Sequence, residues 1–314
     1  MQKTKKAFLL TLIISAFSLS APGRLYAALP GDLNSDGAVS IAEVQKVVNS
    51  FLGLEADSPS IAVNPMYGSP SIFTVSGTNL DKGIVVTPSG ACTNLTERHG
   101  GTATIRSYWC VPSSVGSLNI TISSASGGAV LSQASFVVPN PQVTMETTKG
   151  TIVVELNPTK APITVKNFLQ YVKVGFYDNT VIHRVVKGFV VQGGGFESST
   201  SSYPSLTQKA ILKTIVLEPP SVTGLSNTQG TIAMARSTYD PNNPLEPRSL
   251  NSATSQFFFN SVNNTSLDTA SGGYAVFGSV VQGMSVVQAI DAVAVGTSNV
   301  PTTMITVTAA TQTQ

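Results

Sequence analysis

Residues 183–195 read HRVVKGFVVQGGG, and this stretch decides which fold we expect for the chain. It places a permanent cation, an aromatic ring and an amide close together, ahead of a glycine-rich turn. Side chains alternate between the two faces of an extended strand, so Arg184, Val190 and Gln192 are expected on one face. Phe189 joins them only if Gly188 bends or bulges the strand, which glycine allows at little steric cost. Taken alone, these residues also fit an edge strand with a solvated arginine and a polar glutamine.

The stretch resembles an active-site strand of the cyclophilins, and the resemblance runs from Val143 to the C-terminus. Further motifs follow in the family's order: VGFYDN at 174–179, GTIAMAR at 230–236, SQFF at 255–258, LD at 267–268 and YAVFG at 274–278. Several specific motifs in one order argue against chance similarity. The resemblance implies a closed antiparallel β-barrel with two covering helices and peptidyl-prolyl cis-trans isomerase activity, which needs no nucleophile, metal or cofactor.

The resemblance also implies a role for each pocket residue. Arg184 would donate to the nitrogen of the twisted prolyl amide, because an arginine stays charged and presents a rigid fork of donors. Gln192 would hold a substrate carbonyl. The expected catalytic set is Arg184, Phe189, Gln192, Phe258, Leu267 and Tyr274, and the expected substrate-binding set is Val190, Ala235, Arg236 and Gln256.

The chain departs from the family pattern at several positions. Tyr274 stands where many members have histidine, Val190 where methionine is frequent, and Ser266 where eukaryotic members often have tryptophan. The 237–252 segment is longer than usual; it is expected to be a tolerated surface insertion, the alternative being that it reshapes the neighbouring subsite. His183 precedes Arg184, so on a strand it faces the other way, and we expect a structural role for it.

Periodicity places regular elements within the C-terminal unit, residues 142–314. Strands are expected at 143–147 and 151–156, ahead of a helix that begins near Pro162. The apolar face of this helix would be Val165, Phe168, Leu169 and Val172. A second helix after Gly283 would present Val286, Ala289, Ile290 and Val293. This pattern is compatible with the barrel, although periodicity alone would not predict one.

The N-terminus has the layout of a secretory signal peptide. Lysines at 3, 5 and 6 precede an apolar run over residues 7–17 and small residues up to Ala27. Cleavage after Ala27 is expected, with cleavage near Ser20 or retention as an anchor as alternatives; the run is short for a membrane span. We therefore expect an exported protein, periplasmic or extracellular. Removing residues 1–27 takes away four of the 18 basic residues and none of the 16 acidic ones, so nothing indicates nucleic-acid binding.

Residues 32–43 read DLNSDGAVSIAE, which fits the twelve-residue calcium loop. The oxygen ligands would come from Asp32, Asn34, Asp36, Ala38 (through its carbonyl), Ser40 and Glu43. A helix follows, so residues 28–56 resemble half of a dockerin; the alternative is a solvated turn. Dockerins carry two repeats and only one is present here, which argues against a cohesin partner.

The central region, residues 60–138, is expected to be a β-sandwich of immunoglobulin-like type. Short β-branched runs such as 71–75, 83–87 and 118–122 alternate with Gly, Pro, Ser and Asn clusters. Cys92 and Cys110 are expected to form a disulfide, the alternative being two buried thiols. Trp109 is expected to pack in the core.

The chain as a whole is therefore expected to be mainly β. The function expected first is a peptidyl-prolyl isomerase that assists the folding of exported, proline-containing polypeptides. The alternative is a non-catalytic proline-peptide binding module tethered at the cell surface.

Overall fold

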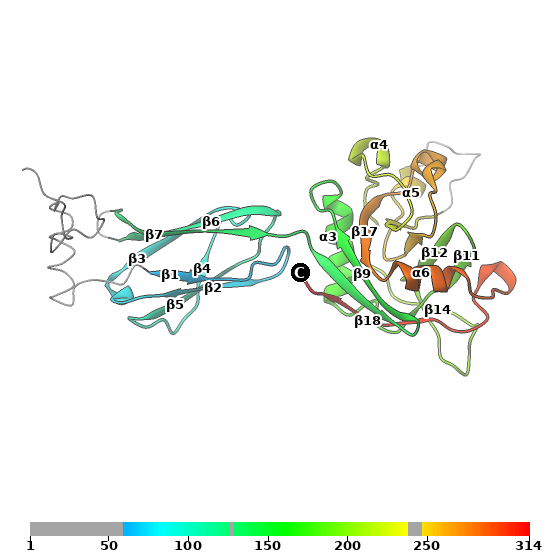
Figure 1. Cartoon of the computed structure of the whole chain (residues 1–314), viewed down its shortest axis with the longest axis horizontal. Coiled ribbons are helices and arrows are strands. Elements are labelled where there is room, and N and C mark those ends of the chain that lie inside the picture. Colours follow the sequence, from blue (N-terminus) through cyan, green and yellow to red (C-terminus); the bar gives the residue numbers. More distant parts are fainter. Residues whose placement is uncertain (1–58, 126–127, 238–246) are drawn as a thin grey trace, which may run out of the picture.

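A computed structural model describes residues 59–125, 128–237 and 247–314 of the chain. The expected signal peptide, the calcium loop with its ligands from Asp32 to Glu43, and most of the 237–252 insertion lie outside the described residues. Two units lie end to end (Figure 1), the first built from residues 59–138 and the second from residues 142–314. None of the helices that the structure describes is long and apolar enough to cross a membrane.

The first unit contains two antiparallel sheets. One has the order β1-β2-β5-β4, from Ser60–Ala62, Ser71–Ser76, Ile105–Cys110 and Thr96–Glu97. The other has the order β3-β6-β7, from Ile84–Gly90, Gly116–Ser124 and Val130–Val138. A short 3-10 helix, η1 (Leu80–Lys82), lies between β2 and β3. The three β-branched runs in the sequence correspond to β2, β3 and β6. The immunoglobulin-like relationship of this unit stays a prediction.

Alternation along the strands decides which side chains fill the interior of the first unit. Phe73 and Val75 of β2 and Leu118 of β6 are fully buried, whereas Ile72 is 48% exposed. A disulfide joins Cys92, in the segment after β3, to Cys110 at the end of β5. The expected core position of Trp109 is wrong: its side chain is 39% exposed, because Tyr108 and Cys110 on either side of it take the inward positions.

The second unit is one long antiparallel sheet. Its order is β11-β12-β16-β15-β17-β9-β8-β18-β10-β13-β14. The strands are β8 (Gln142–Thr147), β9 (Gly150–Leu156), β10 (Thr180–Val181), β11 (Arg184–Val186), β12 (Val190–Gly193), β13 (Phe196–Glu197), β14 (Thr207–Gln208), β15 (Thr231–Met234), β16 (Phe257–Asn260), β17 (Val276–Gln282) and β18 (Thr306–Gln312). Among the described residues the hydrogen-bonded order ends at β11 and β14, so a closed barrel stays a prediction.

Two longer helices and several short ones accompany this sheet. The longer ones are α3 (Pro162–Lys173) and α6 (Met284–Asp291), and the short ones are α4 (Pro220–Thr223), α5 (Pro247–Leu250), η2 (Thr265–Asp268), η3 (Ala270–Gly272) and η4 (Thr297–Asn299). Helix α3 begins at a proline, and the Glu218 carboxylate accepts from the free backbone N–H groups of Ile163 (3.1 Å) and Thr164 (2.8 Å). A negative group suits this end of a helix because the N–H dipoles point toward it.

The predicted face of the first helix is confirmed, and that of the second is partly wrong. Val165, Phe168, Leu169 and Val172 of α3 are all buried. In α6 the buried residues are Val287 and Ile290, while Ala289 is exposed. Val286 and Val293 are partly buried and pack against the core, as predicted, although Val293 lies beyond the helix end; the buried Val287 was not among the expected residues.

Two apolar clusters lie on opposite faces of the sheet in the second unit. The main core contains the fully buried rings of Phe168, Tyr177, Phe257 and Phe277. A smaller cluster on the other face contains Val190, Ala233, Phe258 and Val276, with half-exposed residues packed around it. Since alternate residues of a strand point to opposite faces, this second cluster is where a surface site can form.

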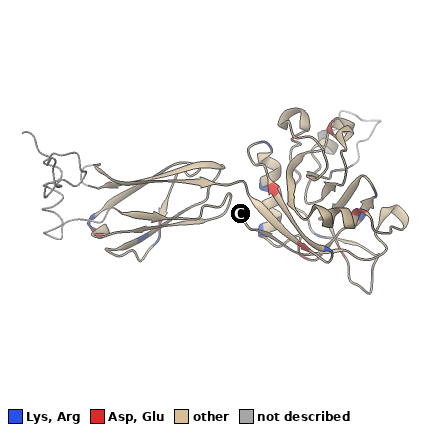
Figure 2. Ribbon diagram, in the orientation of Figure 1, with Lys and Arg blue, Asp and Glu red and all other residues tan. Residues whose placement is uncertain are grey.

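The two units touch through a loop of the first and the last strand of the second. Gln312 of β18 donates to the carbonyl of Tyr67 at 2.9 Å, and Ser69 donates to the Gln312 side chain at 3.3 Å. Charged residues are thinly scattered over both units (Figure 2), as the low charged fraction of 11% requires.

Candidate active site

The segment that opened the sequence analysis forms a hairpin rather than one bent strand. Strands β11 and β12 pair antiparallel, and Gly188 turns the chain between them with φ +66°. Asp291 at the end of α6 holds this turn, since its carboxylate accepts from the Gly188 backbone N–H at 3.0 Å. The hairpin brings Arg184 directly opposite Gln192. The two side chains therefore share a face, as alternation predicted, although β11 is indeed an edge strand.

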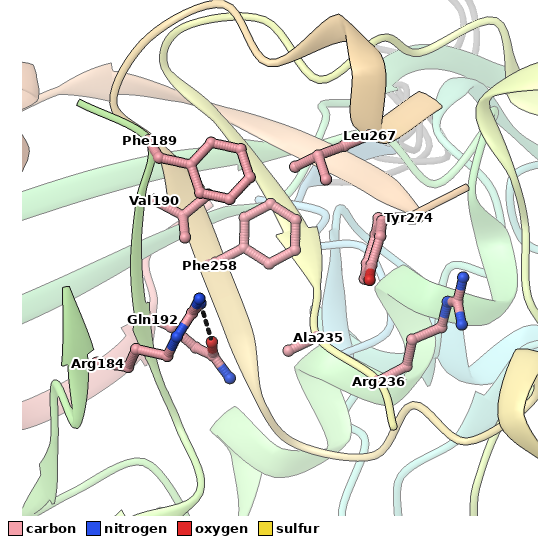
Figure 3. Close-up of a pocket in the computed structure, with 9 residues that line it drawn as sticks. All are labelled: Arg184, Phe189, Val190, Gln192, Ala235, Arg236, Phe258, Leu267 and Tyr274. Carbon is pink, nitrogen blue, oxygen red and sulfur yellow. Dashed lines mark hydrogen bonds between the residues drawn. The ribbon is translucent and has the colours of Figure 1, made fainter. Parts of the chain in front are cut away.

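A pocket of about 360 Å³ opens on the outer face of the sheet beside this hairpin (Figure 3). Its lining comes from β11, β12 and the turn between them, from β16, and from the segments that follow β15 and β16. The residues are Arg184, Phe189, Val190, Gln192, Ala235, Arg236, Phe258, Leu267 and Tyr274. Nine of the ten residues expected from the sequence thus meet in one cavity. The tenth, Gln256, is hydrogen-bonded to a lining residue.

One side of the pocket is polar. Arg184 Nη1 donates to Gln192 Oε1 at 3.2 Å, and Gln192 Nε2 donates to Gln256 Oε1 at 3.0 Å. Within the described part of the chain, no carboxylate forms an ion pair with Arg184. The hydrogen-bonded side chains of Arg184, Gln192 and Gln256 form a row along this side of the pocket. The run of glycines leaves space for the row, because a Cβ on Gly195 would come within 2.5 Å of Gln256 Cγ. The arginine is therefore oriented by a neutral amide, and its charge is not offset by an acid.

The other side of the pocket is apolar. Phe258 and Val190 are 5% and 3% exposed, and the half-buried side chains of Phe189 and Leu267 extend the same surface. Tyr274 closes this side, with its ring centroid 5.8 Å from that of Phe258 in an edge-on arrangement. Such a surface accepts a small apolar ring and excludes water from it.

Arg236 forms the far rim of the pocket. Its guanidinium lies over the Tyr274 ring, 4.6 Å from the centroid, and donates to the Gly273 carbonyl through Nε and Nη2 at 3.1 and 3.0 Å. Burial lowers the pKa of this guanidinium. Arg236 thus fixes both the tyrosine ring and the backbone that precedes it.

His183 lies on the inner side of the strand, as expected. It is 8% exposed and packs edge-on against Phe196, with ring centroids 4.7 Å apart. Burial, reinforced by the nearby Arg184 charge, lowers the pKa of His183 to about 4. The imidazole is neutral at physiological pH and does not face the pocket.

The remaining sequence predictions have mixed outcomes. Ser266 is exposed and does not line the pocket. The two ends of the insertion are joined by a hydrogen bond from the Ser237 backbone N–H to Ser252 Oγ at 2.9 Å, but residues 238–246 lie outside the described residues.

Sequence reasoning missed Leu225, which packs against the outer cluster, and the buried Asn227, Asn260 and Asn264 behind it. Asparagines are mostly exposed in proteins, so the sequence offers no signal for these three.

Comparison with known proteins identifies the family of the second unit. Residues 142–312 match the family described as "Cyclophilin type peptidyl-prolyl cis-trans isomerase/CLD". The chain is 45% identical over 161 residues to "Peptidyl-prolyl cis-trans isomerase B" of Escherichia coli (strain K12), covering 50% of this chain and 87% of the relative. It is 43% identical over 178 residues to "Peptidyl-prolyl cis-trans isomerase" of Acinetobacter baylyi, covering 56% of this chain and 80% of the relative.

A solved structure is also similar. It is a Cryptosporidium parvum cyclophilin type peptidyl-prolyl cis-trans isomerase, determined in the presence of the dipeptide Ala-Pro, with a TM-score of 0.43 and 24% identity over 55% of this chain and 99% of that one. The family match spans more than half of the chain, and the relatives are covered over most of their length. The chain therefore belongs to the cyclophilin-type peptidyl-prolyl cis-trans isomerases and is an enzyme of that activity.

Proposed function

We propose that the pocket of Figure 3 is the catalytic site, with Arg184 as the group that stabilises the twisted prolyl amide, and that the chain assists the folding of exported proteins. One observation carries the catalytic part. The Arg184 guanidinium stands at the edge of an apolar pocket, oriented by Gln192 and not neutralised by a carboxylate among the described residues.

The reaction needs only differential stabilisation. Amide resonance raises a barrier of about 18–20 kcal/mol to rotation about the Xaa-Pro bond. When the bond twists, resonance is lost and the nitrogen regains a lone pair that can accept a hydrogen bond. A donor that binds this nitrogen only in the twisted state lowers the barrier without stabilising the planar substrate. An acceleration of about 10⁵-fold requires about 7 kcal/mol of such stabilisation.

The polar and apolar sides of the pocket divide this work. The proline ring would lie against Phe189, Phe258 and Leu267, which holds the amide next to Arg184. Gln192 would donate to a substrate carbonyl, and Gln256 fixes its amide orientation through the 3.0 Å bond. Ala235, Arg236 and Gln256 would line the adjoining groove for the substrate backbone. Arginine suits the central role because its charge does not depend on pH.

The role in export rests on three features of the chain. The N-terminal layout is that of a signal peptide, the composition is poor in charge, and the two cysteines are joined by a disulfide. Disulfides persist in oxidising compartments outside the cytoplasm. We therefore assign the mature protein to the periplasm or the extracellular space. Its substrates there would be newly exported chains with Xaa-Pro bonds.

The loop from Asp32 to Glu43 supplies a calcium site in this proposal. Its six oxygen positions and the glycine at position six match what calcium requires. Calorimetric titration of the chain with calcium, alongside the Glu43→Gln variant, tests the site. Catalysis itself has no step that would use the ion.

Replacing Arg184 tests the catalytic proposal. Arg184→Ala is expected to lower kcat/KM for a proline tetrapeptide about 100-fold or more in a protease-coupled assay, because it removes a transition-state interaction. Arg184→Lys should recover little, since a point charge lacks the planar fork. Circular dichroism serves as the control for folding. Activity of a folded Arg184→Ala variant near that of the parent would refute the role of Arg184.

A further inference from the structure

A chain of buried polar side chains runs behind the apolar wall of the pocket. Asn227 and Asn260 are fully buried and Asn264 is 6% exposed. They come from the segment before β15, the end of β16 and the segment before η2. Burying an amide costs free energy unless its donors and acceptors are matched, so three such residues together need an explanation.

The amides are matched by one another and by Asp268. Asp268 Oδ1 accepts from the backbone N–H of Asn227 at 2.8 Å and from its Nδ2 at 2.9 Å, and Ser226 Oγ donates to Asp268 Oδ2. Asn260 Nδ2 donates to Asn227 Oδ1 at 3.1 Å, and Asn264 Nδ2 donates to Asn260 Oδ1 at 2.8 Å. The result is one continuous hydrogen-bonded chain from Asp268 to Asn264.

This chain is bonded to the backbone of three pocket residues. Asn264 Nδ2 donates to the carbonyl of Phe189 at 2.7 Å, and Asn227 Nδ2 donates to that of Tyr274 at 3.3 Å. The backbone N–H of Leu267 donates to the main-chain carbonyl of Asn264 at 2.8 Å. Phe189 lies far in the sequence from Leu267 and Tyr274, which are close neighbours in the sequence and are joined directly by the Tyr274 backbone N–H, which donates to the Leu267 carbonyl at 3.1 Å. The polar side chains therefore link Phe189 to the segment that carries Leu267 and Tyr274.

The row that orients Arg184 is separate from this chain. Arg184 is bonded to Gln192, and Gln192 to Gln256. No hydrogen bond found among the described side chains links these residues to Asn227, Asn260, Asn264 or Asp268. The pocket therefore has two supports, one for its charged donor and one for its apolar wall.

We propose that Asn227, Asn260, Asn264 and Asp268 are positioning residues that fix Phe189 relative to the segment of Leu267 and Tyr274, and so set how tightly the proline ring is held. The inference rests on the proposed function of the pocket and adds a determinant of substrate affinity to it. Loosening the wall weakens binding of the ring in both the planar and the twisted substrate. This raises KM and leaves kcat, which depends on Arg184, nearly unchanged.

The electrostatics of Asp268 agree with this arrangement. Burial acts to raise its pKa, but the donors Ser226 and Asn227 outweigh burial and lower it. The carboxylate thus stays ionised and keeps both oxygens as acceptors at neutral pH. The orientation of the Asn227 amide follows from this, because its Nδ2 must face Asp268, which leaves its Oδ1 to accept from Asn260.

Asn264→Asp is the sharpest test, because it keeps the shape of the side chain and removes both donated bonds. A carboxylate cannot donate, so its oxygens would face two other acceptors, the Phe189 carbonyl and Asn260 Oδ1. With the full chain and a single-proline tetrapeptide we expect KM to rise about tenfold and kcat to change less than about twofold. Ser226→Ala, which removes one donor at the more exposed end, should raise KM about twofold.

Thr180→Val is the matched control. Thr180 is fully buried on β10 and donates to the Tyr177 carbonyl at 2.7 Å, so its loss also removes a buried side-chain donor, but away from the pocket. It should lower Tm and leave KM and kcat unchanged. An equal rise in KM for this variant would overturn the proposal. So would an unchanged KM in folded Asn264→Asp or, if that variant does not fold, in Ser226→Ala.

Arg184→Ala, assayed in parallel, separates this inference from the proposed function. It should lower kcat with little change in KM, the reverse of the Asn264→Asp result. If Arg184→Ala kept its activity, the catalytic assignment would fail. The KM values of Asn264→Asp and Ser226→Ala could still be compared with that of the parent protein. If both variants changed kcat and KM in the same proportion, the separation into two supports would be wrong.

Discussion

Phe257 and Phe258 are neighbours on β16, yet they lie on opposite faces of the sheet and in different surroundings. Phe257 is fully buried, and its ring lies 5.8 Å from that of Phe168 and 5.5 Å from that of Tyr177. Phe258 is nearly as buried, but its ring faces the pocket and the half-exposed Tyr274. The inner face is closed by other rings, whereas the outer face carries an open pocket.

The same residue type therefore fills the core on one face and, on the other, lines the pocket that we propose as the substrate site. Inside, aromatic rings pack against one another at centroid distances of 4.6–5.9 Å. Outside, the cluster around Phe258 is small, and polar side chains hold its wall through backbone carbonyls. A core needs only to be filled, but a pocket must stay open while its walls remain fixed.

Truncating each of the two phenylalanines gives the largest expected effect. Phe257→Ala should cost about 3–5 kcal/mol of unfolding free energy, because it leaves a cavity among rigid rings. Phe258→Ala should cost less, since its cavity opens to solvent, but should lower kcat/KM about tenfold or more by removing the floor of the ring pocket. Urea unfolding and the tetrapeptide assay measure the two effects. Equal losses of stability with no difference in activity would mean that the two faces are not distinct.

The pH dependence of the unfolding free energy tests the inner face, because the buried His183 lies there. Its folded-state pKa is about 4, against 6.5 for an exposed histidine, so between these values the unfolded chain binds the proton. The stabilisation is present above about pH 6.5 and falls by about 3 kcal/mol as the pH drops to about 4. His183→Gln should remove this part of the dependence. His99→Gln, at the exposed and only other histidine, should leave it unchanged; a slope that His183→Gln did not alter would contradict the assignment.

Gly195→Ala should have the smallest effect and should act on the outer face alone. The new Cβ would push Gln256 away and weaken its bond to Gln192, because the two atoms would otherwise be 2.5 Å apart. We expect kcat/KM to fall about threefold with a change in Tm of only a few degrees. Gly296→Ala is the control, since its nearest neighbouring atom would be 3.9 Å away. A comparable loss of activity in the control would exclude the proposed contact.

The sequence by itself determined much of this protein. Ordered motifs from Val143 onward identified the isomerase unit, and alternation in β11 and β12 placed Arg184 with Gln192. The face of α3 followed from its 3.6-residue period. These features are local, because a strand or helix carries its periodicity in consecutive residues. The cysteine pairing was a weaker inference, drawn from composition and compartment, not from geometry.

Only the tertiary structure decided the rest. The outward position of Trp109 depends on which strand residues face the opposing sheet, and that of Ala289 on which side of α6 packs against the sheet. The burial of Asn227, Asn260 and Asn264 requires partners from distant segments. A hydrogen bond between residues 33 positions apart leaves no periodic trace in the sequence, so folding alone makes these residues the support of the pocket.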